Sequence, residues 1–270
     1  MILQETPVFD ALYIGATGMQ AQQLNVDTIA NNLANVNTTG FKKSRVSFTD
    51  LVAQEAGRIQ SATDAQSGPL STLPNLGAGV GISNVAKLFD VGNLQQTGSS
   101  FDVAIQGEGF LEVALPDGSR AFTRGGTLKV NADGLLVTQA GYTLKPGISV
   151  PSNAKALTIA ADGHVRISVP NQSSPIEAGQ LELVHFASPG MLQAQGDNLY
   201  RATDASGDPV VGKAGQDNLG TFSQGFLEGS NVKMVDEMVG LMVAQRAYEA
   251  NVKVVQASDE ILGMVNNLRK

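Results

Sequence analysis

Two segments at opposite ends of the chain carry apolar residues at every seventh position, which limits how the chain can fold. In the first segment, residues 6 to about 37, these are Leu12, Met19, Val26 and Leu33. In the second segment, residues 229–270, they are Met234, Leu241, Tyr248, Val255 and Leu262. A seven-residue repeat is typical of helices that pack along a shared seam. Because an isolated helix is marginal in water, we expect the two segments to pair as a coiled-coil-like domain.

The second row of each repeat is small or polar, so we expect the seam between the helices to be weak. It consists of Ala16, Gln23, Ala30 and Asn37 in the first helix and of Met238, Gln245, Val252, Asp259 and Asn266 in the second. Gly15 and Gly18 each lower helix stability by about 1 kcal/mol relative to Ala, but they allow another backbone to come close. The apolar residues beside the seam are left for other copies of the chain, and these are Val235, Val239, Met242, Ile261 and Val265.

The ends of both helices carry recognisable signals. Thr6 can cap the first helix, Pro7 suits its first turn, and Gly40 suits the left-handed backbone that follows a helix. For the second helix, Ser230 or Asn231 is the expected cap.

Between the helices the apolar period changes from about 3.5 to 2, which predicts strands. The expected strands are residues 102–105, 110–113, 128–130, 135–137, 157–159, 165–167 and 181–184. Asp117-Gly118, Asp133-Gly134 and Asp162-Gly163 separate several of them and supply the positive φ angles of tight hairpins. The fold class is therefore α+β, with a central, mainly antiparallel β domain. The expected boundaries are 1–52 with 226–270 for the helical polymerisation domain, 53–83 for an extended connector and 84–225 for the β domain.

Charge and composition exclude several functional classes. The formal net charge of −7 argues against a nucleic-acid binder and against a polybasic membrane anchor. The chain has no Cys, and His164 and His185 lack any local ligand spacing, so we expect no metal site and no cofactor. With only 16% charged residues, the surface is mostly neutral and polar, which favours self-association. No basic residue precedes Lys42, so we expect no cleaved signal peptide. The apolar stretch at 238–244 is too short to cross a membrane.

Catalytic motifs are missing, so we expect no enzymatic activity. Two Ser-x-x-Lys matches, at 152–155 and 230–233, lack the companion motifs of that enzyme class. The Asp-Gly pairs are better explained by turns than by calcium binding. The basic cluster Lys42, Lys43 and Arg45 is expected to form a solvated face or an ion pair between subunits.

Several long motifs resemble those of the bacterial flagellar rod and hook proteins. IANNLANVNTTGFK at 29–42 is similar to their N-terminal signature. GSNV at 229–232, EMV at 237–239 and QRAYEAN at 245–251 are similar to their C-terminal signature. In the middle, GNLQQTG at 92–98 and FDVAIQGEGF at 101–110 also match. The resemblance covers nearly the whole chain, and the chain length and the connector favour the distal rod type. A proximal rod or hook-type axial protein is the alternative.

The resemblance implies a structural subunit that polymerises into a hollow helical drive shaft and transmits motor torque to the hook. The terminal helices would line the channel, with the β domain outside them. Expected partners are other copies of the chain, proximal rod proteins, the hook protein, the P- and L-ring bushing, the rod cap and the flagellar type III export apparatus. The expected location is the basal-body rod that spans the periplasm. An enzyme with a carbohydrate-active β domain, or a soluble adaptor or chaperone with a coiled coil, is a competing function.

Residues of both helices are the candidates for subunit packing. They are Leu12, Met19, Val26, Asn31, Asn32, Leu33, Met234, Met238, Leu241, Tyr248, Val252, Val255 and Leu262. Asn is a mediocre helix former, so its presence at positions 31 and 32 needs a reason. We expect the side chains of Asn31 and Asn32 to hydrogen-bond neighbouring subunits.

Overall fold

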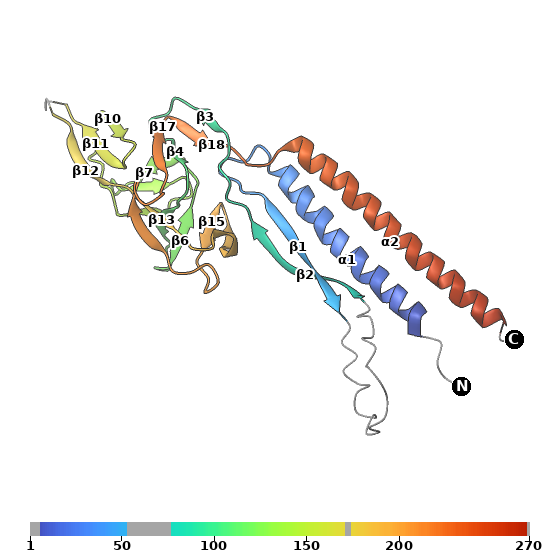
Figure 1. Ribbon diagram of the computed structural model, residues 1–270. Helices are drawn as coiled ribbons and strands as arrows, with labels where there is room; N and C mark the ends of the chain where they lie inside the picture. Colours follow the sequence, from blue (N-terminus) through green and yellow to red (C-terminus); the bar gives the residue numbers. More distant parts are fainter. Residues whose placement is uncertain (1–5, 53–76, 171–173, 269–270) are drawn as a thin grey trace, which may run out of the picture. The chain divides into compact units, whose positions relative to one another are not determined.

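The computed structural model describes residues 6–52, 77–170 and 174–268 (Figure 1). The chain forms two compact units, each built from segments that are distant in sequence. The first unit holds Met1–Asn31, Arg45–Val85 and Val235–Lys270, and the second holds Asn32–Ser44 and Ala86–Met234. The α+β class is confirmed, with a long helix toward each end and antiparallel strands between them. None of the described helices is long and apolar enough to cross a membrane.

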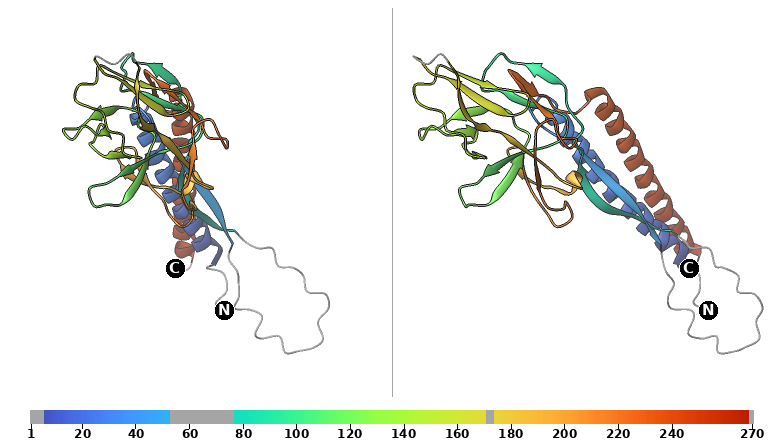
Figure 2. Two further views of the ribbon diagram at one scale, coloured as in Figure 1. Left: turned by 90° about the vertical axis from the view of Figure 1, so that its left-hand side faces the viewer. Right: turned by 60° about the vertical axis from the view of Figure 1, so that its left-hand side comes forward.

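The first unit contains two long helices and a pair of strands. Helix α1 spans Thr6–Ala34 and helix α2 spans Met234–Leu268. Strands β1 (Ser44–Val52) and β2 (Gly77–Lys87) form a two-stranded sheet. Figures 1 and 2 show α1 lying between α2 and this sheet. The expected connector began at residue 53 and ended at 83; residues 77–83 are strand, while residues 53–76 lie outside the described part.

The two helices pack side by side and antiparallel, and glycines in α1 set how closely they approach. A Cβ atom on Gly15 would lie 2.7 Å from Val255 Cγ2, and one on Gly18 would lie 2.8 Å from Asn251 Nδ2. At the other end of the pair, a Cβ on Gly240 would lie 3.5 Å from Ile29 Cδ1. The low helix propensity of these glycines is therefore offset by close packing, as the sequence predicts.

The seam of α2 differs from the predicted one by one residue. In the first predicted row, Leu241, Val255 and Leu262 are half-buried, whereas Met234 and Tyr248 are exposed. The most buried residues of the companion row are Ala244 and Ser258. They belong to the row Glu237, Ala244, Asn251 and Ser258. The predicted companions Met238, Gln245 and Asp259 are exposed, whereas Val252 is half-buried. Ala16, Gln23 and Ala30 of α1 are exposed too, as is Asn37, which lies beyond the end of that helix. The close approach at the glycines favours small side chains on the facing helix, and this outweighs the larger apolar surface of Met238.

The predicted cap of the second helix is wrong. Helix α2 begins at Met234, after both Ser230 and Asn231. Asn231 instead bonds segments of the second unit, as described below. Helix α1 ends at Ala34, before the expected position, and Gly40 takes the predicted left-handed conformation with a φ of 69°.

The second unit is built from short strands in several sheets, and every strand pair with a described register is antiparallel. Its strands are β3 (Leu94–Gln96), β4 (Val103–Gln106), β5 (Leu111–Ala114), β6 (Arg120–Thr123), β7 (Leu128–Val130), β8 (Leu136–Thr138), β9 (Thr143–Lys145), β10 (Ala156–Ile159), β11 (His164–Ser168), β12 (Ile176–Gln180), β13 (Glu182–His185), β14 (Gln193–Gly196), β15 (Leu199–Arg201), β16 (Val210–Lys213), β17 (Thr221–Gln224) and β18 (Phe226–Glu228). A short 3-10 helix, η2, spans Pro189–Met191. The largest sheet has seven strands in the order β14-β15-β6-β5-β9-β8-β7, and β10-β11-β12 form a second sheet.

The three predicted Asp-Gly turns are confirmed. They connect β5 to β6, β7 to β8 and β10 to β11, and each connected pair is antiparallel. Gly118, Gly134 and Gly163 have φ values of 80°, 76° and 88°. A left-handed residue at the turn matches the twist of the two strands that it joins.

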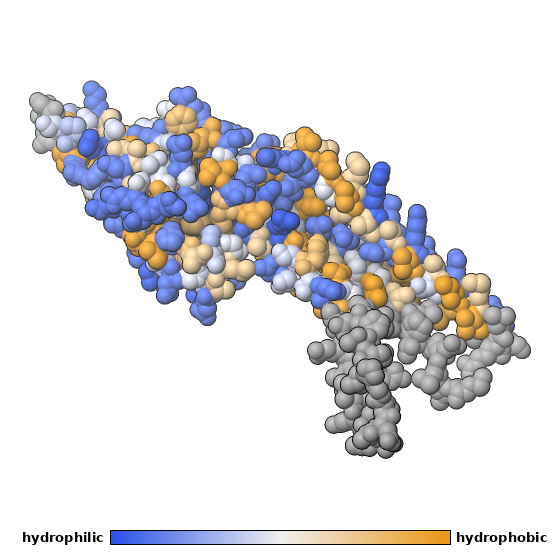
Figure 3. All heavy atoms as spheres, viewed as in Figure 1, coloured by the Kyte–Doolittle hydropathy of each residue, from blue (hydrophilic) through white to orange (hydrophobic). Residues whose placement is uncertain are grey.

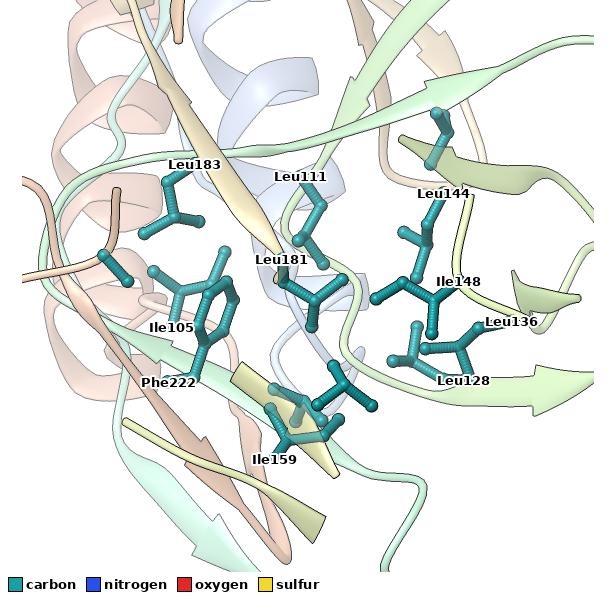
Figure 4. Packing of buried hydrophobic residues seen from close by; sticks show 14 of the residues in the cluster. Ile105, Leu111, Leu128, Leu136, Leu144, Ile148, Ile159, Leu181, Leu183 and Phe222 are labelled. Carbon is teal, nitrogen blue, oxygen red and sulfur yellow. The ribbon is translucent and has the colours of Figure 1, made fainter. Parts of the chain in front are cut away.

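Two apolar clusters fill the second unit. The larger one gathers side chains from many strands, and Figure 4 shows Ile105, Leu111, Leu181 and Phe222 pointing toward one region. The smaller one is aromatic and contains Phe110, Phe122, Phe186 and Tyr200, with Phe89 packed against it. Ring centroids in this cluster lie 4.8–6.1 Å apart in edge-to-face geometry, which favours aromatic pairs.

Candidate functional site: an apolar helix face and a buried ionic junction

The first half of α2 presents apolar side chains that the chain itself leaves open. We call six of them the α2 apolar face: Met234, Val235, Met238, Val239, Met242 and Val243. Their exposed fractions run from 49% to 72%. Figure 3 shows hydrophobic side chains gathered along the surface of this helix. Soluble chains rarely leave so continuous an apolar surface open unless it binds a partner.

The second half of α2 has a different outer surface. Arg246, Glu249, Lys253, Gln256 and Glu260 are all exposed there. Apolar residues on this half, Val254, Ile261, Met264 and Val265, are 45% to 59% exposed. The two halves of the helix therefore present different chemistry, the first apolar and the second mixed.

The structure places the predicted packing residues in three groups. Half-buried residues are Leu12, Met19, Val26, Leu33, Leu241, Val252, Val255 and Leu262. Exposed residues are Asn31, Met234, Met238 and Tyr248. Asn32 is buried. The flanking residues expected to remain open, Val235, Val239, Met242, Ile261 and Val265, are indeed exposed, whereas Val243 and Met264 were missed. Contact of any of these residues with another subunit stays a prediction.

Asn32 forms hydrogen bonds within its own chain, and its expected bond to a neighbouring subunit stays a prediction. Its side chain is 2% exposed, its Oδ1 accepts the Ser44 N–H at 2.8 Å, and its Nδ2 donates to the Ser44 carbonyl at 2.9 Å. These two bonds use the amide within its own chain, so Asn32 fixes the segment that follows α1. The corresponding hypothesis for Asn31, which is exposed, stays a prediction.

Sequence reasoning missed a buried ionic cluster in the second unit. Lys42, Arg124 and Glu228, which we call the Glu228 junction, are each 2% exposed or less. Glu228 Oε1 accepts from Lys42 Nζ at 2.7 Å, and Oε2 accepts from Arg124 Nε at 2.9 Å. Lys42 is therefore a buried partner within its own chain, which corrects the expectation that it lies on a solvated face or pairs between subunits.

Backbone groups add further hydrogen bonds to the junction. Lys42 Nζ donates to the Asp90 carbonyl at 2.6 Å, and the Gly92 N–H donates to Glu228 Oε1 at 2.8 Å. A Cβ atom on Gly92 would collide with the carbonyl oxygen of Gly229. The backbones of these two segments therefore lie in direct contact, with no room for a side chain between them.

Arg124 has the largest number of partners in the junction. Its Nη1 donates to the Gly109 carbonyl at 2.9 Å. Its Nη2 donates to the carbonyls of Gly107 at 2.9 Å and Ile105 at 3.3 Å. A planar guanidinium supplies these donors in a fixed fork, so Arg124 links β4 and the loop after it to the carboxylate of Glu228.

Asn231 fastens the segment that precedes α2. Its Oδ1 accepts the Lys43 N–H at 2.8 Å, and its Nδ2 donates to the Leu88 carbonyl at 2.8 Å and to the Asp90 carbonyl at 3.3 Å. Asn32, near the end of α1, binds Ser44, and Asn231, just before α2, binds the adjacent residue Lys43. The two side chains thus hold the end of α1 and the segment before α2 to the same short stretch of backbone.

The charges of the junction shift one another's pKa. Burial raises the pKa of the Glu228 carboxyl, but Arg124 and then Lys42, through charge and hydrogen bonds, outweigh it, so the net pKa lies below the usual 4.5. Burial and the Arg124 charge lower the pKa of Lys42 despite the attraction of Glu228. Burial also raises the pKa of Tyr200, in the neighbouring aromatic cluster, to about 12. The junction therefore holds two cations and one carboxylate away from water.

The lowered pKa of Glu228 predicts a loss of stability in acid. The folded chain binds this proton less readily than the unfolded chain, so the stabilisation is complete above the unfolded value of 4.5. It is lost as the pH falls from there through the folded pKa. We expect the urea midpoint of the second unit to fall more steeply below about pH 5 in the wild type than in Glu228→Gln. Equal slopes in the two proteins would contradict this.

Among the described residues, no group of three or more His, Asp or Glu side chains is placed to hold a metal ion. The Glu228 junction brings three charged side chains together in a buried cluster. Their bonds are to one another and to backbone groups, so the site supports a structural role for them.

Family profiles match the chain in three places. A profile described as "Flagella basal body rod protein" matches residues 12–42, which cover most of α1 and Lys42. One described as "Flagellar hook protein FlgE/F/G D1 domain" matches residues 104–167. One described as "Flagellar basal body rod FlgEFG protein C-terminal" matches residues 223–268, which cover Glu228 and α2. Together with the helix pair and the β unit, these matches define an axial protein of the flagellar rod and hook class.

Relatives cover almost the whole chain. The flagellar basal-body rod protein FlgG of Borreliella burgdorferi is 45% identical over 263 residues, which cover 96% of this chain and 98% of the relative. That of Agrobacterium fabrum is 44% identical over 257 residues, covering 95% and 98%. That of Bacillus subtilis is 37% identical over 265 residues, covering 96% and 99%. The chain belongs to the flagellar basal-body rod protein family, and the resemblance seen in the sequence is confirmed.

Proposed function

We propose that this protein is a structural subunit of the distal rod, and that it assembles with copies of itself into a hollow helical shaft that transmits torque to the hook. The observation that carries the proposal is the α2 apolar face, six side chains that are 49% to 72% exposed on a helix otherwise paired with α1. The family to which the chain belongs supplies the setting, and the open face supplies the surface through which copies of the chain join.

The size of the apolar face is sufficient for assembly. Complete burial of a Val or Met side chain is worth about 1.5–3 kcal/mol. Six side chains that are about half exposed or more therefore offer on the order of 5 kcal/mol per contact. Each subunit of a helical polymer makes several such contacts, so modest individual contacts add up to a stable shaft.

A helix pair also suits the transmission of torque. Gly15 and Gly18 bring α1 close to Asn251 and Val255 of α2. This close packing opposes sliding of one helix along the other, so the pair moves as one rigid unit. Interdigitated packing of this kind is close to crystal density and deforms little. In a shaft built from such pairs, rotation of one subunit is passed directly to the next.

The partners beyond the chain itself follow from this role. We propose that the shaft contacts proximal rod proteins at one end and the hook protein at the other, with the P- and L-ring bushing around it and the rod cap at its growing end. Export by the flagellar type III apparatus, without a cleaved signal peptide, would deliver the subunits to the periplasm-spanning rod. No catalytic step is needed in this role.

The proposal is tested by the association of the purified full-length chain. We expect sedimentation to show monomers at low concentration and long oligomers above a threshold, with tubular particles in electron micrographs of the same samples. A chain that stays monomeric over the whole concentration range would contradict the proposal. Oligomers that are closed and small would contradict the shaft.

A further inference from the structure

The last two strands of the second unit, β17 and β18, pair with its first two strands, β4 and β3. Strand β17 pairs with β4 from Thr221–Gln106 to Gln224–Val103, and β18 pairs with β3. Phe222 of β17 is 2% exposed in the larger apolar cluster. We call residues 221–232 the strap, because this single segment covers β4 and β3 and ends two residues before α2.

The strap also carries the only carboxylate of the Glu228 junction. Without Glu228, the side chains of Lys42 and Arg124 would meet in the same buried site as two cations. Arg124 would keep the carbonyls of residues 105, 107 and 109, but its Nε would lose its acceptor. Lys42 Nζ would lose its bond to Glu228 and keep its bond to the Asp90 carbonyl. An uncompensated buried charge is among the most destabilising changes that a folded chain can suffer.

We propose that the strap completes the fold of the second unit, which becomes stable only when residues 221–232 dock on β3 and β4. Glu228 acts as the latch in this step, because its carboxylate is the group that Lys42 and Arg124 need as a partner. A chain that ends before residue 221, through proteolysis or incomplete synthesis, then lacks the carboxylate that Lys42 and Arg124 share and leaves β3 and β4 without the strands that pair with them. Such a chain cannot present a finished subunit to an assembly, so the latch excludes damaged copies. The device acts within one chain and does not depend on the proposed shaft.

Three variants of the full-length chain separate the latch from ordinary packing. Glu228→Gln keeps the shape of the side chain and removes its charge. Lys42→Met combined with Glu228→Gln also removes one of the two cations. Glu182→Gln, on half-buried Glu182 of β13, is the matched control. Each protein is measured by hydrogen exchange in dilute solution, below any association threshold.

We expect Glu228→Gln to lower the exchange protection of β3, β4, β17 and β18 together, on the order of 100-fold. The control should remain near the wild type. The double variant should regain on the order of 10-fold of the lost protection, because the repulsion between Lys42 and Arg124 is then gone. If Glu228→Gln matches the control, or if the double variant loses more protection than Glu228→Gln, the latch is wrong.

Refolding of the wild-type chain tests the order of events. With pulse-labelled exchange, we expect the amides of β4 to become protected in the same kinetic phase as those of β18. Protection of β4 in an earlier phase than β18 would overturn the closing role of the strap. Because both measurements use monomers, their result is independent of whether the chain forms a shaft.

Discussion

Replacing Met238 and Met242 by Glu is expected to abolish assembly while leaving the monomer folded. Both side chains are 54% exposed in the single chain, so their replacement removes little packing within it. In an assembly, the same positions would place two carboxylates against apolar neighbours. Burying a charge without a partner is costly, and every 1.4 kcal/mol changes an equilibrium by about tenfold. We expect the threshold concentration for association to rise on the order of 100-fold or more.

The measurement is sedimentation across a concentration series, with thermal unfolding of the monomer as the test of folding. Gln256→Glu is the matched control, because it adds a carboxylate to the same helix on its exposed, charged half. The control should associate almost like the wild type. Unchanged association of the Met238→Glu, Met242→Glu double variant would show that the α2 apolar face is not a subunit contact.

Replacing Arg124 by Lys is expected to destabilise the second unit severely, although the charge is kept. Arg124 makes bonds to Glu228 and to three backbone carbonyls, and all three guanidinium nitrogens take part. A Lys ammonium is a single point on a flexible stem, so it cannot reach these acceptors together. The carbonyls left behind are buried and unsatisfied. We expect a loss on the order of 3 kcal/mol in the free energy of unfolding.

Arg120→Lys is the control for this change. Arg120 lies on β6, four residues before Arg124, and its side chain is 59% exposed at 4.0 Å from Glu112. Exposed ion pairs contribute about 0–1 kcal/mol, so the urea midpoint of Arg120→Lys should stay close to that of the wild type. Equal urea midpoints for the two variants would show that the fork geometry of the Arg124 guanidinium does not contribute to the stability of the second unit.

The local features of this fold could be predicted from the sequence. The seven-residue repeats indicated both helices, and alternation indicated seven of the strands, together with the three Asp-Gly turns between them. Each of these depends on residues that are near one another in the chain. Strands such as β14, whose four residues are all exposed, lack the alternation that marks a half-buried strand and were missed for that reason.

The helix seam shows where a periodic pattern stops being sufficient. Hydrophobicity favoured the row that contains Met238, but the structure buries the row that contains Ala244 and Ser258. The choice depends on the distance between the helices, which is set by Gly15 and Gly18 on the other helix. The sequence of α2 taken by itself does not indicate how closely α1 approaches it.

The Glu228 junction could not be predicted from local patterns. Lys42 and Glu228 are 186 residues apart in sequence, and Lys42 belongs to a run of basic residues that is more often solvated. The available signal was the position of these residues within or beside the family signatures at 29–42 and 229–232. The signatures mark these two segments as characteristic of the family, but they do not indicate which side chains contact one another in the fold.

The central claim is that the terminal helices join copies of the chain through the open face of α2. A high-resolution electron microscopy structure of the polymer formed by the full-length chain tests it most directly. We predict that Val235, Val239 and Met242 are buried against neighbouring subunits, with α1 and α2 still paired. A polymer in which these three side chains face solvent, with subunits joined only through their β units, would contradict the account.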